Sequence, residues 1–462
     1  MISELGFDIP FDWKVFNLVD VASEEKRSII SGPFGSSISS KFFIDEGIPV
    51  IRGSNLSVDI KKFNEEGFVF ISREKAEELK AWALSGDIVF TAAGTLGQIN
   101  IIPESSKFSE YIISNKQLRV RLNEKLVVPM FAYYWLKNKP MVSHIINQNT
   151  GSTVPLINLT ILKKLPIALP RINEQKQIVN ILESLDDKIE LNDAINKNLE
   201  EMAQAIFKRW FVDFEFPNEN GEPFKSSGGE FEESELGLIP KGWRVGTLSD
   251  LGEVVGGATP SKSKEEYYTT WGIPWITPKD MSINKNKYIS RGQIDITEEG
   301  FKSSSTRIVP KGTVLFSSRA PIGYIAVSKN EVTTNQGFKS LIPFEHIGSE
   351  FLYYVLKFNT ETIENRASGS TFKEISGSEM KRVPVIIPPF YVIEQFNIIV
   401  EPIGKMVEKC ESESDSLIQL RDSLLPKLMS GEIRAPLKQE YSYSQMFELP
   451  MAAEKKAQYS TT

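Results

Sequence analysis

A single apolar stripe follows residues 174–210 at the spacing of an α-helix. Steps of three and four residues meet an apolar side chain each time, except at Asn192. A stripe this narrow predicts a partner helix, because it covers only one side of the helix. The stripe consists of Ile178, Leu182, Leu185, Ile189, Asn192, Ile195, Leu199, Met202, Ile206 and Trp210.

A matching stripe begins downstream, at Glu394, and its polar break is Glu413. Two helices of about 37 residues, each roughly 55 Å long, can pair as a two-stranded coiled coil. Either stretch alone would equally suit a core helix, and only the matched pair favours the coiled coil. Pro402 and Gly404 predict a kink early in the second helix. The second stripe consists of Ile399, Ile403, Met406, Cys410, Glu413, Leu417, Leu420, Leu424 and Leu428.

Each stripe lies at the C-terminal end of one copy of a longer repeated pattern. Trp13 recurs as Trp243 after the same Ser-Glu-Leu-Gly and Ile-Pro lead-in. Further on, residues 86–90 match 312–316, residues 131–134 match 351–354, and Gly151-Ser152-Thr153 matches Gly369-Ser370-Thr371. The chain is therefore a tandem duplication. If its helices pair antiparallel about a pseudo-two-fold axis, the two modules lie at opposite ends of the pair.

Each copy places a module of about 160 residues before its helix. Short β-type runs such as residues 87–94 alternate with helical pieces such as residues 73–84, which predicts an α+β fold. We expect two tandem α/β modules joined by two long helices that form an antiparallel coiled coil. The predicted boundaries are 1–170 for the first module, 171–212 for the first helical region, 213–233 for a surface linker, 234–390 for the second module, 391–434 for the second helical region and 435–462 for a C-terminal tail.

Composition limits the function classes only partly. The 462 residues are 41% hydrophobic and 24% charged, as expected of a globular protein with more than one domain. A net charge of −7 does not exclude a nucleic-acid partner, because only the contact face must be positive. The single cysteine, Cys410, excludes a disulfide framework. The chain shows neither a signal sequence nor an apolar run long enough to span a membrane, so we expect a cytoplasmic protein.

Polar turns flanked by glycine are the candidate contact surfaces. Arg, Lys, Asn and Gln can bond to base edges, while Ser and Thr suit phosphate oxygens, although all of them also occupy ordinary solvated turns. The two copies agree in their framework and differ in these polar residues, which favours the recognition of two different DNA targets. The candidates are Ser36, Arg52, Ser54, Asn55, Thr91, Thr95, Gln98, Lys116, Gln117, Ser152 and Thr153, then Lys262, Lys264, Thr277, Lys279, Ser317, Ser318, Arg319, Asn335, Gln336, Ser370 and Thr371.

No motif of a catalytic or metal site is complete. Residues 387–390 (IPPF) end like an amino-methyltransferase signature but lack its leading Asn or Asp. Glu174 and Lys176 have the spacing of a nuclease half-motif without the upstream Pro-Asp, and no nucleotide-binding loop is present. His144 and His346 have no acid or cysteine at ligand spacing. We therefore expect neither catalytic residues nor a bound metal.

The chain closely resembles the specificity subunit of type I restriction–modification enzymes. The resemblance rests on Trp13 and Trp243, the Gly-Ser-Thr turns, residues 165–170 with the following Glu-Gln, and the helix ends at 207–217 and 424–433. It implies a non-catalytic subunit with two target-recognition domains, each of which reads one half of a bipartite double-stranded DNA sequence. It also implies that the helices set the spacing and dock two methylation subunits and, through them, restriction subunits.

The resemblance further implies that this chain holds no cofactor, because S-adenosylmethionine and ATP bind to the partner subunits. Two other functions remain open from the residues alone. One is a self-contained DNA methyltransferase or nuclease, against which the missing motifs argue. The other is a coiled-coil adaptor that does not bind DNA.

Overall fold

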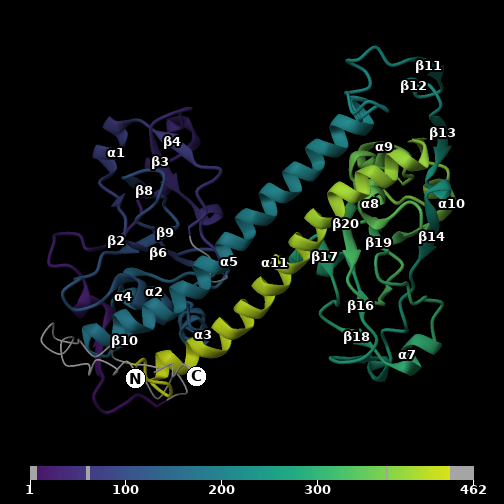
Figure 1. Ribbon diagram of the computed structural model, residues 1–462. Coiled ribbons are helices and arrows are strands. Elements are labelled where there is room, and N and C mark those ends of the chain that lie inside the picture. The colour runs from purple at the N-terminus through teal and green to yellow at the C-terminus, as the bar shows by residue number, and fades with distance from the viewer. Residues whose placement is uncertain (1–7, 59–62, 370–372, 437–462) are drawn as a thin grey trace, which may run out of the picture. The chain divides into compact units, whose positions relative to one another are not determined.

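The computed structural model describes residues 8–58, 63–369 and 373–436. The chain divides into two compact units, and each combines one module with part of both long helices (Figure 1). The first unit comprises residues 1–187 and 417–462, and the second comprises residues 188–416. Helices and sheets mix in both units, so the predicted α+β class is confirmed.

The first unit holds two four-stranded sheets. One is antiparallel, in the order β2-β9-β6-β7, and the other has the order β4-β3-β8-β5 with β3 parallel to β8. The antiparallel pair β1-β10 joins the two ends of the module. The strands are β1 (Lys14–Asn17), β2 (Ile29–Ser31), β3 (Ile48–Ile51), β4 (Val69–Ile71), β5 (Trp82–Ala83), β6 (Ile88–Thr91), β7 (Ile99–Ile101), β8 (Tyr111–Ile113), β9 (Gln117–Val120) and β10 (Pro166–Leu169), and the helices are α1 (Arg73–Leu79), α2 (Pro129–Lys137), α3 (Lys139–Asn147) and α4 (Leu159–Lys163).

The second unit repeats this topology. Its five-stranded sheet contains β14-β22-β19-β20 in the positions of β2-β9-β6-β7, β13-β23 matches β1-β10, and the parallel pair β16-β21 matches β3-β8. The internal repeat is therefore confirmed. The strands are β11 (Phe231–Ser234), β12 (Gly237–Pro240), β13 (Arg244–Thr247), β14 (Gly252–Gly256), β15 (Tyr268–Thr269), β16 (Trp275–Ile276), β17 (Tyr288–Ile289), β18 (Asp295–Ile296), β19 (Val314–Ser318), β20 (Ile322–Ser328), β21 (Thr333–Thr334), β22 (Lys339–Pro343) and β23 (Pro384–Ile387), and the helices are α6 (Pro278–Ile283), α7 (Glu298–Lys302), α8 (Ser349–Phe358), α9 (Thr360–Asn365) and α10 (Gly377–Lys381).

Alternation along the central strands explains why each module has two cores. Ile88 and Phe90 of β6 join the cluster that includes the helices, while Val89 between them joins the cluster of the other sheet. In the second unit, Phe316 and Leu315 of β19 divide between two clusters in the same way. Both faces of these strands are therefore buried, which leaves only their ends and loops to meet a partner.

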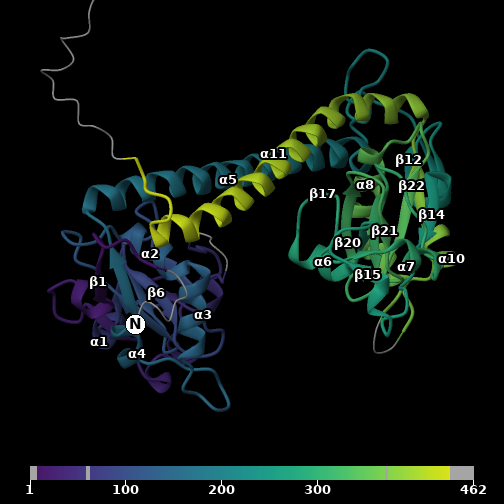
Figure 2. The ribbon, with the colours of Figure 1, turned by 90° about the horizontal axis from the view of Figure 1, so that it is seen from below.

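The long helices are α5 (Ile172–Phe207), which continues in a π-helical turn at Lys208–Val212, and α11 (Phe390–Ser430). They run antiparallel in both units, as the residue numbers of their contacts show (Figures 1 and 2). In the first unit Asp186 contacts Arg421, and in the second unit Asn192 contacts Glu413 and Phe207 contacts Phe396. Regular coiled-coil geometry stays a prediction.

The polar breaks of the two stripes meet. The buried Asn192 donates from Nδ2 to Glu413 Oε2 at 3.0 Å and to Ser414 Oγ at 3.3 Å. Asn192 and Lys188, whose Nζ lies 3.1 Å from Glu413 Oε2, hold the pKa of Glu413 below its usual value. The buried Asn192 disfavours other registers, because a shifted helix would leave its amide buried without these partners.

Part of the predicted stripe does not face the partner helix. Met202, Ile399, Met406 and Leu420 are exposed. The reason is that each helix also packs on a module, which widens and rotates the buried face. The buried positions of α11 are Val392, Ile393, Phe396, Val400, Gly404, Val407, Glu411, Ser414, Arg421, Leu425, Leu428 and Met429. The first turn of α11 is formed, and the helix continues through Pro402.

The segment after each long helix packs on the start of a module. Trp243 contacts Phe211 and Phe216, and Phe224 stacks on Phe216. Residues 213–233 are therefore partly core, whereas the sequence predicted a surface linker. In the first unit, Gly431 lies close to Trp13. A Cβ atom added to this glycine would be 3.4 Å from the tryptophan ring.

Ion pairs also hold the residues after α11 against the start of the first module. Arg434 donates from Nη2 to Asp12 Oδ2 and to Glu174 Oε2, both at 2.8 Å. These bonds tie the residues beyond α11 to the beginning of the chain and to the first turn of α5. Residues 437–462 of the predicted tail lie outside the described residues.

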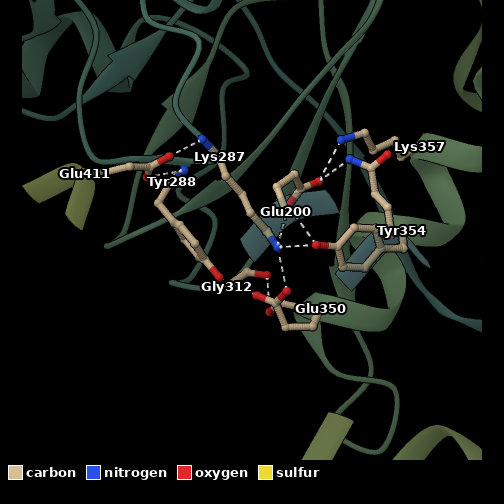
Figure 3. Close-up of polar contacts among 10 residues, drawn as sticks. Glu200, Lys287, Tyr288, Gly312, Glu350, Tyr354, Lys357 and Glu411 are labelled. Atoms are coloured by element: carbon tan, nitrogen blue, oxygen red, sulfur yellow. Dashed lines mark hydrogen bonds and ion pairs between the residues drawn. The ribbon is translucent and has the colours of Figure 1, made fainter. Parts of the chain in front are cut away.

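A buried polar network fixes the second module to both helices (Figure 3). Lys287 Nζ donates to Glu350 Oε2 at 2.7 Å and to the Tyr354 hydroxyl at 3.1 Å. The same hydroxyl donates to Glu200 Oε2 of α5 at 2.8 Å. Glu411 of α11 accepts the backbone N–H of Lys287 at 2.6 Å. Burial raises the pKa of Glu411 to about 7.

We expect Glu411→Gln to stabilise the chain above neutral pH. The raised pKa means that the folded chain keeps a proton that the unfolded chain releases above about pH 4.5. The folded state therefore loses stability as the pH rises from about 4.5 to about 7, and this loss persists at higher pH. Gln avoids this cost and keeps an acceptor for one of the two backbone N–H groups that bond to Glu411, those of Lys287 and Tyr288. Urea unfolding should show a gain of roughly 3 kcal/mol at most at pH 8. The gain should shrink toward pH 4.5. A difference independent of pH, or the same trend in the exposed-site control Glu401→Gln, would contradict this account.

Arg421→Ala should destabilise the first unit strongly. Arg421 Nη1 donates to Asp186 Oδ1 at 2.8 Å, and both side chains are buried, so removing the guanidinium leaves a buried carboxylate without its counter-ion. Such losses cost about 3–5 kcal/mol. Chemical unfolding of the full chain should show this effect. The control Lys302→Ala, which breaks an exposed pair with Glu298, should change stability by less than about 1 kcal/mol. Equal losses of stability in the two variants would show that the buried Asp186–Arg421 pair is not the cause.

Candidate nucleic-acid interface

The strand pairing of the first unit brings several predicted contact residues to one edge. Arg52 follows β3, Thr91 ends β6 and Lys116 precedes β9. Thr91 lies opposite Gln117 in the β6–β9 register, so the end of β6 meets the start of β9. Because β3 is parallel to β8, the loops after these two strands also emerge at a common edge.

These loops enclose a polar cavity of about 470 Å³. Residues of four separate loops line it, and six of them are predicted contacts: Arg52, Thr91, Thr95, Gln98, Lys116 and Gln117. The other lining residues are Ile38, Phe43, Val50, Gly53, Ala93, Gly94, Ser114 and Asn115. A concave surface rich in hydrogen-bonding groups binds the edge of a polar ligand better than it binds an apolar ligand.

Gln98 holds two of the loops together. Its Oε1 accepts from Thr91 Oγ1 at 2.8 Å, and its Nε2 donates to the carbonyls of Gly53 and Leu56 at 3.2 and 3.1 Å. Gln117 is buried, and its amide is hydrogen-bonded to the Ser114 hydroxyl. These two amides therefore shape the cavity.

Asn55 has a similar structural role. It is buried, its Oδ1 accepts from the Arg52 backbone N–H at 3.0 Å, and its Nδ2 donates to the carbonyls of Asn64 and Glu66. Arg52 Nη2 donates to the Gly67 carbonyl at 2.9 Å, while its buried Nε has no hydrogen-bond partner. Asn55 thus positions the loop that carries Arg52 into the cavity.

The Gly-Ser-Thr turn of the first unit adjoins this site. Ser152 and Thr153 are exposed, as is Ser54 on the Arg52 loop. The Gly94 backbone N–H, inside the cavity wall, donates to the Pro155 carbonyl at 3.0 Å. This bond ties the Ser152 loop to the β6–β7 loop and places both turns at the same edge.

Sequence reasoning missed an exposed aromatic ring on this edge. Phe34 is 89% exposed and precedes the turn that contains Ser36. Gly32 and Gly35 lie on either side of it. A Cβ atom added to Gly32 would be 1.8 Å from the Ser114 carbonyl oxygen, and one added to Gly35 would be 3.1 Å from Asn115 Nδ2. The two glycines thus allow the loop to press on the cavity wall. The Gly-Pro-Phe-Gly pattern was the available signal.

The equivalent edge of the second unit also gathers predicted residues. Thr277 and Asn335 follow the parallel strands β16 and β21 directly. Asn335 Oδ1 accepts the Gly337 N–H at 2.8 Å, and the Gln336 side chain is hydrogen-bonded to Thr259. Thr277 accepts from the N–H of the third helical residue and caps α6.

Two predicted residues of the second unit are interior. Ser317 and Ser318 are fully buried. Ser317 Oγ donates to the Pro321 carbonyl and accepts from the Tyr324 N–H, both at 2.8 Å. This hydroxyl therefore braces the β19–β20 hairpin. Serine in such a turn cannot be assigned to the inside from its sequence alone.

Charged groups surround that hairpin. Arg319 Nη1 lies 3.2 Å from Glu374 Oε2, and Lys339, which the sequence did not single out, lies 3.6 Å from Glu374 Oε1. Ser370 and Thr371 lie outside the described residues. Glu374 thus holds both cations beside the hairpin.

The three predicted lysines of the second unit are all exposed. Lys264 donates to the Tyr267 hydroxyl at 3.0 Å, and Lys262 precedes it on the same loop. Lys279 lies in the first turn of α6, next to Thr277. Their contact with a ligand stays a prediction.

Metal sites and membrane spans are equally absent from the described part of the chain. Among residues 8–58, 63–369 and 373–436, no three His, Cys, Asp or Glu side chains are grouped to hold a metal. No helix within those ranges is long and apolar enough to cross a membrane.

Comparison with known proteins places this architecture in a family. The sequence model of the type I restriction modification DNA specificity domain matches residues 10–201 and 240–409. The solved structure of the S subunit of a type I restriction-modification system from M. genitalium superposes with a TM-score of 0.56 at 17% identity, covering 91% of this chain and 96% of that chain. This likeness shows a shared fold.

Named relatives agree. The MjaIX specificity subunit of Methanocaldococcus jannaschii is 44% identical over 192 residues, which are 41% of this chain and 44% of that protein. The HindI specificity subunit of Haemophilus influenzae is 26% identical over 476 residues, covering 91% of this chain and 100% of that protein. Because the two family matches together span well over half of its residues, the chain belongs to the type I restriction–modification DNA specificity family and is a specificity subunit.

Proposed function

We propose that each module reads one half of a bipartite double-stranded DNA sequence, and that the chain itself performs no chemistry. The observation that carries this proposal is the first-unit cavity, where the loops after four strands bring polar side chains together. The polar residues of the strand-end loops differ between the units, while the two antiparallel sheets share the order of four strands. Polar groups at such loops can bond to base edges, and exposed cations can neutralise phosphates.

The catalytic activities then belong to partners. We infer that two methylation subunits assemble with this chain and bind S-adenosylmethionine, and that restriction subunits bring ATP-dependent cleavage. The name of the HindI relative, a type I restriction enzyme specificity subunit, supports such a complex. The long antiparallel helices would set the spacing of the two half-sequences.

Exposed apolar side chains on the helices supply a surface for a methylation subunit. Leu191 and Met202 of α5 lie about three helical turns apart, and Ile399 and Met406 of α11 lie about two turns apart. All four side chains are at least 43% exposed. Rows of exposed apolar residues on a helix are typical of protein interfaces.

Lys116→Gln should weaken binding to DNA without changing the bases that are recognised. Lys116 is exposed at the mouth of the cavity, so we expect it to contact a phosphate. The affinity of the full chain with its methylation partner should fall about tenfold, and the salt slope of log K should flatten by about one. Lys125→Gln makes the same charge change beyond the opposite end of β9 and serves as the control.

The matching cellular experiment maps methylated adenines for wild type and Lys116→Gln. Methylation should decline at all sites of one shared bipartite sequence, and its bases should stay the same in both halves, because a phosphate contact carries no base information. An altered base in either half would contradict the phosphate contact. Absence of any bipartite methylated sequence in wild-type cells that depends on this chain would contradict the proposed function.

Met406→Asp should weaken assembly with the methylation subunit. A charge on an exposed interface residue must lose its hydration on binding, while the unbound chain tolerates it. Co-purification should show an affinity reduced by at least about tenfold. Leu238→Asp, at a similarly exposed position of the β11–β12 hairpin, should assemble as wild type does. Equal assembly of both variants would place the docking surface elsewhere.

A further inference from the structure

The second unit displays a tryptophan whose ring is mostly uncovered. Trp271 is 81% exposed, on the loop between β15 and β16. The guanidinium carbon of Arg291 lies 3.9 Å from the centre of its ring. With a cation on one face, the other face of this exposed aromatic ring is free to pack on a partner.

One buried carboxylate holds both members of this pair in place. Asp295 Oδ2 accepts the Gly272 backbone N–H at 2.9 Å and Arg291 Nη1 at 2.5 Å. Asp295 is buried on β18, where it pairs with Thr269 of β15. The loop of Trp271 and the guanidinium are thus fixed to the same group. A contact arranged in advance loses less conformational entropy when it binds.

The pair adjoins the predicted contact residues of the same unit. The loop continues from Arg291 to Gln293, whose backbone N–H donates to Asp280 Oδ1 at 2.8 Å. The other oxygen of Asp280 accepts the Thr277 N–H at 2.8 Å. A Cβ on Gly292 would lie 2.6 Å from the Trp275 carbonyl oxygen, so the loop is pressed against β16. Trp271 and Arg291 therefore share one surface with the start of α6.

We infer that Trp271 and Arg291 form a clamp on the DNA backbone at the half-sequence read by the second module. The free ring face packs on a deoxyribose. Arg291 holds Asp295 through Nη1 and has further N–H groups that can donate to a phosphate. The inference rests on the proposed DNA function. It adds contacts that strengthen binding and orient the duplex without reading bases.

The test uses the full chain assembled with its methylation partner. Binding is measured between about 50 and 200 mM salt on a duplex that carries the mapped methylation sequence and on one that lacks it. Trp271→Ala should weaken binding on the order of tenfold with an unchanged salt slope, because it removes an apolar contact. Arg291→Gln should weaken binding and also flatten the slope by about one.

Both variants should methylate the wild-type sequence, because backbone contacts carry no base information. Leu238→Ala, which shortens another exposed apolar side chain of this unit, should bind DNA as wild type does. Trp271→Phe should retain most of the affinity, and wild-type melting temperatures for the variants would exclude unfolding as the cause.

Three results would overturn the clamp. They are wild-type affinity of Trp271→Ala, an unchanged salt slope for Arg291→Gln, and an altered base in the methylated sequence, which would indicate base reading. A wild-type complex that does not distinguish the two duplexes would instead refute the proposed function.

Discussion

The burial of each module against both long helices is the contact on which the rest of the structure depends. In the second unit, Phe351 of α8 meets Phe211, at the end of the first helix, and Phe396 of α11, with ring centres 5.0 and 6.1 Å away. In the first unit, Leu182 of α5 and Leu428 of α11 join the same core as Phe131 of α2. Neither module therefore completes its core without the two helices.

Because this shared core stabilises the fold, the loops at the strand ends can carry different residues in the two units. Gln98, which ties the first-unit loops together, has Tyr324 as its counterpart in the second unit, where Ser317 braces the hairpin instead. Arg52 corresponds in the same way to Thr277, which caps a helix. Four strands of the antiparallel sheet beneath keep the same order in both units. One scaffold can thus present different donors and acceptors at its two equivalent edges.

Periodicity and repetition predicted the two helices, the duplicated α+β modules and the polar turns that line the cavity. They could not determine which polar side chains turn inward, because Asn55 and Ser317 look like solvated turn residues until their backbone partners are known. The stepping rule also could not separate Met202, which is exposed, from the buried Ala203. The Trp271–Arg291 stack joins residues 20 positions apart through strand pairing, which no local pattern encodes.

The hydrogen bonds from Arg434 to Asp12 and Glu174 can form only after nearly the whole chain has been synthesised. The first module emerges long before residues 417–436, which complete its unit. At about 5–20 residues per second, synthesis of the intervening segment of roughly 250 residues takes on the order of ten to fifty seconds. During that interval the apolar surface that will receive Leu425 and Leu428 remains open. A nascent chain interrupted there would therefore display an unfinished core, the kind of surface that chaperones and proteases recognise.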